Sequence, residues 1–68
     1  MDIARAVNAM LEKSGLSQAD LARRGGLSTA WVNMVCKGKT KDITLEKAKT
    51  LCNVFGISLD EFAKLADT

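Results

Sequence analysis

The chain has 68 residues, 47% of them hydrophobic and 26% charged, with a formal net charge of +2. This length predicts one domain over residues 1–68, with a core close to the smallest that folds alone and no second, ligand-sensing domain. The apolar residues form no run long enough to span a bilayer, and the first residues do not resemble a signal peptide, so we expect a cytoplasmic protein.

The residue types present argue against an enzyme or a metalloprotein. The chain has no histidine, and its two cysteines, Cys36 and Cys52, stand far apart rather than in a C-x-x-C pair. We expect both thiols to be small, buried hydrophobic groups in a reducing compartment. A core of this size is also too small to enclose a substrate pocket. We therefore predict no catalytic residue, metal, cofactor or small-molecule ligand.

Charge is unevenly distributed along the chain. Residues 23–49 contain seven basic and two acidic side chains, a net charge of +5, whereas the remainder contains three basic and six acidic side chains, a net charge of −3. A basic middle between acidic ends suits contact with a polyanion on one side of the molecule. The alternative is that these charges only form a solvated surface.

The first predicted helix begins near residue 3. Apolar residues recur at helical spacing from Ile3 to Leu11, and Ser14-Gly15 indicates where this helix ends. The expected core face of the helix therefore lies on its apolar side.

Two short helices follow, over residues 18–24 and 29–36. Ser17 can cap the first, and Asp20 stands where a carboxylate meets the exposed N–H groups at the helix start. Gly25-Gly26 can break the helix and supply a positive φ, and Ser28 can cap the second helix. Two short helices joined at a glycine turn have the shape that fits a DNA major groove.

A polar loop over residues 37–42 separates this pair from two closing helices. Thr44 can cap a fourth helix that Gly56 ends, and Ser58 with Glu61 forms a capping box for a fifth. The expected inner face of the fourth helix is Leu45, Ala48, Leu51, Cys52 and Phe55, and that of the fifth is Leu59 and Phe62 with Ala63 or Leu65. With no strand predicted, the fold class is all-α, a compact five-helix bundle.

The spacing of the helix pair resembles the phage-repressor and Cro-type helix-turn-helix family. The residues that carry the resemblance are Gln18, Leu21, Ala22, Gly26, Leu27, Ser28, Val32 and Gly38, in register without a gap. The segments around residues 43–46 and 55–61 look like the two closing helices of that family. The resemblance implies a lambda-repressor-like fold and a nucleoid-associated regulator that binds double-stranded DNA. Its most specific form is a Cro-like repressor acting as a homodimer on an inverted-repeat operator.

The resemblance also places the start and the outer face of helix 29–36 in the major groove. The predicted base contacts are therefore Thr29, Ala30, Asn33 and Met34. An amide at Asn33 can pair with adenine N6 and N7, and the methyls of Thr29 and Ala30 suit the thymine methyl group. Because the set contains no arginine, we do not expect strong guanine readout.

Phosphate contacts are predicted on both sides of this helix. Gln18 lies at the first turn of its own helix, and Lys37, Lys39 and Lys41 alternate along the loop that in the family follows the DNA backbone. Trp31 has two readings: its indole N–H reaches a phosphate, or its ring packs across a neighbouring helix.

The chain departs from the family pattern at three positions. Gly25 stands where an apolar side chain is usual, which predicts a loosely packed, frayed end of the helix. Leu11 and Cys36 replace an arginine and a glutamate that form a buried ion pair in many members. Since both partners are replaced by apolar residues, no charge is left unpaired. The alignment predicts that Leu11 and Cys36 touch, and a structure with the two in separate clusters would contradict it.

A dimer is expected because one recognition helix reads only a few base pairs. Phe55 and Ile57 are the candidate dimer interface, and the alternative is that both belong to the core. The competing function is a protein-interaction module, such as an adaptor or antitoxin-like domain, with weak or no DNA binding.

Overall fold

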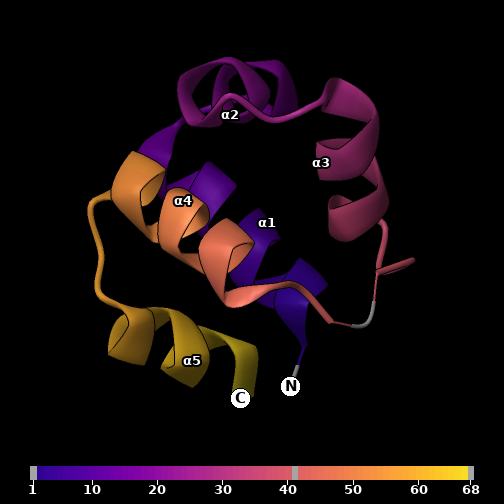
Figure 1. Cartoon of the computed structure of the whole chain (residues 1–68). Helices are drawn as coiled ribbons and strands as arrows, with labels where there is room; N and C mark the ends of the chain where they lie inside the picture. Colours follow the sequence, from indigo (N-terminus) through magenta and orange to yellow (C-terminus); the bar gives the residue numbers. More distant parts are fainter. Residues whose placement is uncertain (1, 41, 68) are drawn as a thin grey trace.

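The computed structural model describes residues 2–40 and 42–67, and these residues form five helices and no strand (Figure 1). The helices are α1 (Ile3–Ser14), α2 (Gln18–Gly25), α3 (Thr29–Cys36), α4 (Leu45–Phe55) and α5 (Leu59–Asp67). The all-α, five-helix prediction is confirmed, and the predicted boundaries agree to within one residue. None of the helices in the described part of the chain is long and apolar enough to cross a membrane.

The helix starts are fixed by the capping side chains that the sequence predicts. The Thr44 hydroxyl accepts the Lys47 N–H at 3.1 Å, and α4 begins directly after it. At the start of α5, the Ser58 hydroxyl accepts the Glu61 N–H at 3.1 Å, and the Glu61 carboxylate accepts the Ser58 N–H at 3.3 Å. Each cap satisfies N–H groups that have no partner inside the helix, so the sequence sets where each helix begins.

One hydrophobic core lies between the helices. α1 packs against α3 and α5, and α2 packs against α3 and α4. The largest fully buried side chains of this core are Val7, Leu21, Val32, Val35 and Leu51. No described polar or charged residue is buried, so burial of apolar area carries the stability without a desolvated charge.

The two ends of the described chain are joined. The N–H of Asp2 donates to the carbonyl oxygen of Ala66 at 2.6 Å, which holds the start of α1 beside the end of α5 (Figure 1). Burial of Ala66, which the sequence analysis did not place in the core, follows from this contact between α1 and α5.

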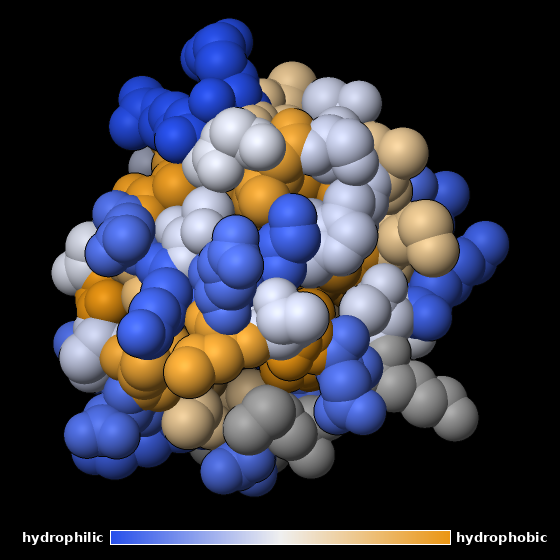
Figure 2. Space-filling model, in the orientation of Figure 1, coloured by the Kyte–Doolittle hydropathy of each residue, from blue (hydrophilic) through white to orange (hydrophobic). Residues whose placement is uncertain are grey.

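The prediction that Leu45 and Leu59 lie in the core is wrong. Leu45 is 63% exposed and Leu59 is 38% exposed. Each is the first residue of its helix, so it lies at the edge of the bundle beyond the part that its neighbours cover. Both line a mostly apolar hollow together with the buried Ile3 and Phe62. Hydrophobic patches separated by hydrophilic side chains are visible on the surface in Figure 2.

The departures from the family pattern have structural outcomes. Leu11 lies in the core and Cys36 packs against the same cluster, so the two apolar replacements are not in separate clusters. Gly25 differs from expectation, because it is the last residue of α2 and its surroundings are close. A Cβ at Gly25 would lie 3.1 Å from a Leu27 methyl and 3.2 Å from the Thr50 methyl. Neighbouring side chains fill the space that an apolar residue would otherwise occupy.

Candidate nucleic-acid interface

α2 and α3 meet at a sharp turn whose geometry is set by local hydrogen bonds. Gly26 has φ 64°, a left-handed conformation that costs side-chain-bearing residues about 1–2 kcal/mol. Its N–H points back to the carbonyl oxygens of Ala22 and Arg23, and the Leu27 N–H donates to Ala22 O at 2.8 Å. The chain can therefore leave α2 and enter α3 within three residues, which places the two helices at an angle (Figure 1).

A capping box fixes the start of α2. The Ser17 hydroxyl accepts the Asp20 N–H at 3.0 Å, and the Asp20 carboxylate accepts the Ser17 N–H at 3.1 Å. The same carboxylate forms a salt bridge of 2.8 Å with Arg23. Hydrogen bonds from the Ser17 backbone and side chain hold the pKa of Asp20 below its ordinary value, and the positive charge of Arg23 adds to this effect. α2 therefore keeps an ionised carboxylate at its positive end.

The two faces of α3 differ sharply. Val32 and Val35 are each 1% exposed, whereas Met34 is 46% exposed and Thr29 and Ala30 are also exposed. The Ser28 hydroxyl caps the helix by accepting the Trp31 N–H at 3.0 Å. The structure thus presents the start and the outer face of α3 to solvent, with no charged side chain on that face.

A side-chain hydrogen bond joins the two helices of the pair. The Nδ2 amide of half-buried Asn33 donates to Oε1 of Gln18 at 3.2 Å. Two residues predicted separately, one for bases and one for phosphate, are therefore in contact. The bond leaves the Gln18 amide nitrogen and the Asn33 carbonyl oxygen available to other partners.

Trp31 packs toward α4. Its ring is half-buried against the core, and the Lys47 ammonium lies 5.2 Å from the ring centroid. Packing across a neighbouring helix was one of the two readings of Trp31, and the structure confirms that part. The sequence analysis counted Lys47 only among the basic residues of the middle segment and missed its position. The spacing of the two residues gave no signal of this contact.

The loop after α3 carries exposed lysines on an ordered turn. Gly38 has φ 77° and donates its N–H to Val35 O at 3.1 Å, and the Lys39 N–H donates to Met34 O at 3.0 Å. Lys37 and Lys39 are both exposed, and Lys41 lies outside the described residues. The structure therefore places two of the three predicted loop lysines next to the end of α3.

The end of α3 is also tied to α1. The Asn8 side-chain amide donates to the Cys36 carbonyl oxygen at 2.9 Å. This bond satisfies a carbonyl that has no partner inside the helix. Asn8 is a further supporting residue that the sequence analysis missed, because the contact joins positions 28 residues apart.

The thiols sit in apolar surroundings. Cys52 is buried and donates to Ser58 O at 3.7 Å, whereas Cys36 is half-buried. Burial raises the pKa of both thiols, and the nearby Glu61 carboxylate adds to the effect at Cys52. Among the described residues, no group of three or more histidine, cysteine or acidic side chains could hold a metal ion.

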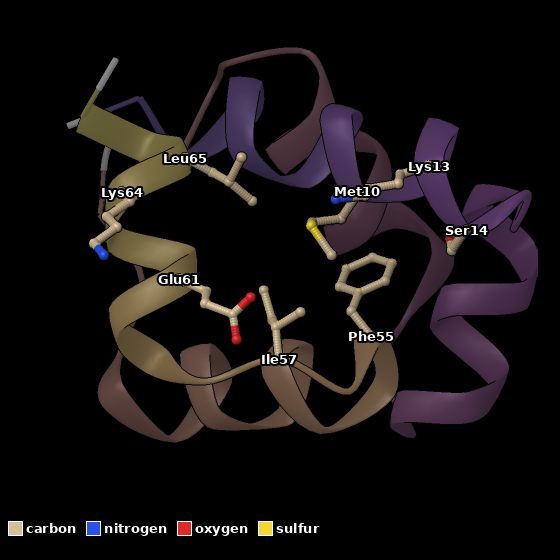
Figure 3. Close-up of a pocket in the computed structure, with 8 residues that line it drawn as sticks. All are labelled: Met10, Lys13, Ser14, Phe55, Ile57, Glu61, Lys64 and Leu65. Carbon is tan, nitrogen blue, oxygen red and sulfur yellow. The ribbon is translucent and has the colours of Figure 1, made fainter.

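Phe55 and Ile57, the predicted dimer residues, line a hollow of about 540 Å³ between α1, α5 and the end of α4 with the turn that follows it. Both are half-buried and pack on the core, so they are partly core residues as well as surface ones. In Figure 3, Met10, Phe55 and Ile57 point toward one another inside the hollow, while Lys13 and Lys64 lie at its edge.

Comparison with known proteins agrees with this geometry. A comparison with curated proteins found no match. A model of the helix-turn-helix family matches residues 7–62, which include α2, α3 and α4 in full and most of α1. The chain therefore belongs to the helix-turn-helix family of the Cro/C1 type, a family of DNA-binding regulators.

Proposed function

We propose that this protein is a sequence-specific regulator that binds double-stranded DNA through α3. The observation that carries the proposal is the exposed, uncharged outer face of α3. Charged side chains usually cover the solvent side of a surface helix, so an uncharged outer face with an exposed Met34 favours an interaction surface. Thr29, Ala30, Asn33 and Met34 are the proposed base-contacting residues. The exposed lysines of the adjoining loop suit the phosphate backbone.

Asn33 is the residue proposed to distinguish bases. Its amide donates one N–H to Gln18, which leaves a second N–H and the carbonyl oxygen. These two groups match N7 and N6 of adenine in the major groove. The bond to Gln18 supports this role because it limits the rotation of the Asn33 amide before DNA arrives.

Phosphate contacts supply the affinity in this proposal. They come from Gln18, Lys37, Lys39 and Lys41, with the Trp31 indole N–H as a neutral contact. Contacts with lysine release counterions from DNA, so binding weakens as salt rises, whereas neutral donors fix the register of the protein.

The proposed active species is a homodimer on an inverted repeat, with half-sites about 34 Å apart, acting as a Cro-like repressor in the cytoplasm. We assign a second copy of this chain to the hollow lined by Phe55 and Ile57. Lys13, Lys64 and Glu61 also line this hollow, so the same patch holds both signs of charge. A twofold axis places a surface against itself, and opposite charges within one patch can then pair between the copies.

Selection from random duplexes followed by footprinting tests the function. We expect a symmetric site, with affinity that falls steeply between about 50 and 200 mM salt. A protein that ignores duplex DNA even at low salt is instead a protein-interaction module.

Sedimentation across a concentration series tests the dimer. Ile57→Lys should weaken self-association, and Leu45→Lys is the matched control because Leu45 is apolar and exposed but lies outside the hollow. If Leu45→Lys weakens self-association and Ile57→Lys does not, the dimer interface includes Leu45 and not the hollow lined by Phe55 and Ile57. One monomer per optimal site, with no symmetry in the selected sequences, overturns the dimer.

A further inference from the structure

Lys47 and Trp31 form an arrangement that the proposed function does not yet use. The ammonium of Lys47 lies 5.2 Å from the centroid of the Trp31 ring, within the range of a cation–π contact. Both side chains are half-buried, and the Lys47 N–H is fixed by the Thr44 cap at the first turn of α4. No carboxylate from residues 2–40 or 42–67 lies within salt-bridge distance of this ammonium. Its positive charge is therefore held in place by an aromatic face and not neutralised.

The position of this charge relative to α3 matters. Residues follow one another by about 100° around a helix, so Trp31 and Asn33 lie about 160° apart on α3. Asn33 faces Gln18 of α2, whereas Trp31 faces Lys47 of α4. The outer face of α3 is thus bordered on one side by the Gln18 amide and on the other by the Lys47 ammonium.

A helix in the major groove has a sugar-phosphate backbone on each side, across a groove about 12 Å wide. We propose that Lys47 is a phosphate-binding residue whose ammonium is positioned by Trp31. The Lys47 ammonium contacts the sugar-phosphate backbone on the side of the groove opposite the one that Gln18 reaches. This inference rests on the proposed DNA binding by α3. The inference adds α4 to the proposed interface. It also gives Trp31 the role of positioning Lys47, which differs from the neutral phosphate contact proposed for the Trp31 indole N–H.

The dependence of affinity on salt measures this contact. Each phosphate neutralised by a cation adds about 0.9 to the slope of log affinity against log salt. In Lys47→Ala we expect the slope to become shallower by about 0.9, equally on the preferred site and on random duplex. Its affinity deficit relative to wild type should then shrink about 3.5-fold between about 50 and 200 mM salt. Lys47→Arg keeps the charge and the stacking, so it should keep the wild-type slope.

Lys49→Ala is the matched control. Lys49 carries the same charge two residues along α4, is exposed, and lies about 160° away around the helix. We expect it to leave the slope unchanged. If Lys47→Ala keeps the wild-type slope, or if Lys49→Ala loses as much, Lys47 does not bind phosphate and the inference is wrong.

Trp31→Leu tests the positioning role. The indole has no charge, so any change of slope in this variant must act through a cation. We expect Trp31→Leu to lose the same part of the slope as Lys47→Ala, and the double variant to lose no more than either single one. A Trp31→Leu protein that is folded by circular dichroism and keeps the full slope overturns the role of Trp31.

Failure of the inference can be told from failure of the function. A wild-type protein with no salt-dependent DNA binding overturns the proposed function and this inference with it. A wild-type protein that binds, while Lys47→Ala retains its slope, overturns the inference alone. If Trp31→Leu does not fold, the Lys47→Ala, Lys47→Arg and Lys49→Ala series still decides the phosphate contact.

Discussion

Two adjacent apolar residues of α3, Val35 and Met34, have opposite surroundings. Val35 is 1% exposed and anchors the helix to the core, whereas the adjacent Met34 is 46% exposed. Hydropathy alone does not separate these neighbours, since both are apolar. Their difference comes from the turn at Gly26 and from α1 and α2, which cover one face of α3 and leave the other open. For these two neighbours, position on the helix rather than hydropathy decides which side chain is buried.

The largest expected effect falls on the buried face. Val32→Ala removes two methyl groups from a side chain that is 1% exposed. We expect the free energy of unfolding to fall by about 2–3 kcal/mol, from lost burial plus the cavity left behind. Denaturant unfolding followed by circular dichroism measures this loss. Met34→Ala is the control on the open face, with an expected change within about 0.5 kcal/mol. Equal losses would remove the distinction between the faces.

Substitutions on the exposed face of α3 should change DNA binding rather than stability. Asn33→Ala is expected to cost about 1–3 kcal/mol on the preferred site and much less on random duplex. Gel-shift or anisotropy titrations on the two duplexes give the difference. The loss of the hydrogen bond to Gln18 is common to both duplexes, so it cancels in the comparison. Equal losses on both would show that Asn33 does not read a base.

The loop after α3 should act on affinity without specificity. Lys37→Ala or Lys39→Ala is expected to weaken binding to all duplexes alike and to lower the salt slope by about 0.9 each. Affinities measured at several salt concentrations test this. Lys49→Ala is a suitable control, because Lys49 is exposed on α4 and is not among the proposed DNA or dimer contacts. A change of sequence preference in either loop variant would assign that lysine to base reading.

The smallest expected effect concerns the start of α2. The Ser17 hydrogen bonds lower the pKa of Asp20 in the folded state, so the unfolded chain takes up a proton first as the pH falls. The stabilisation is fully present above the ordinary aspartate pKa of about 4, and it is lost as the pH falls below that value. Unfolding titrations from pH 7 to pH 3 test this against Asp20→Asn. At pH 7 the variant should have a smaller free energy of unfolding than the wild type, and this difference should narrow in acid. A difference in free energy of unfolding that stays constant with pH would contradict the stabilising role of the Asp20 charge.

Much of the fold follows from the sequence alone. Ser17, Ser28, Thr44 and Ser58 cap helices as predicted, because a hydroxyl at a helix start meets N–H groups within three residues. The apolar spacing also identified the buried face of α1. These are local signals, and they fix helix boundaries and the order of the elements.

Burial at the ends of helices was not predictable in the same way. Leu45 and Leu59 have the hydropathy and spacing of core residues, but they are the first residues of α4 and α5 and are only partly covered there. Ala66 is buried through its contact with the start of α1, more than sixty positions away. Whether an apolar side chain is covered depends on which other helix reaches it.

The sequence by itself determined the five helices, the glycine turn between α2 and α3, and the uncharged set of residues on the outer face of α3. Only the tertiary structure decided that Asn33 bonds to Gln18, and that Lys47 lies over Trp31. The reason is physical: caps and turns depend on atoms within a few residues. Contacts between side chains on different helices depend instead on how the whole core packs.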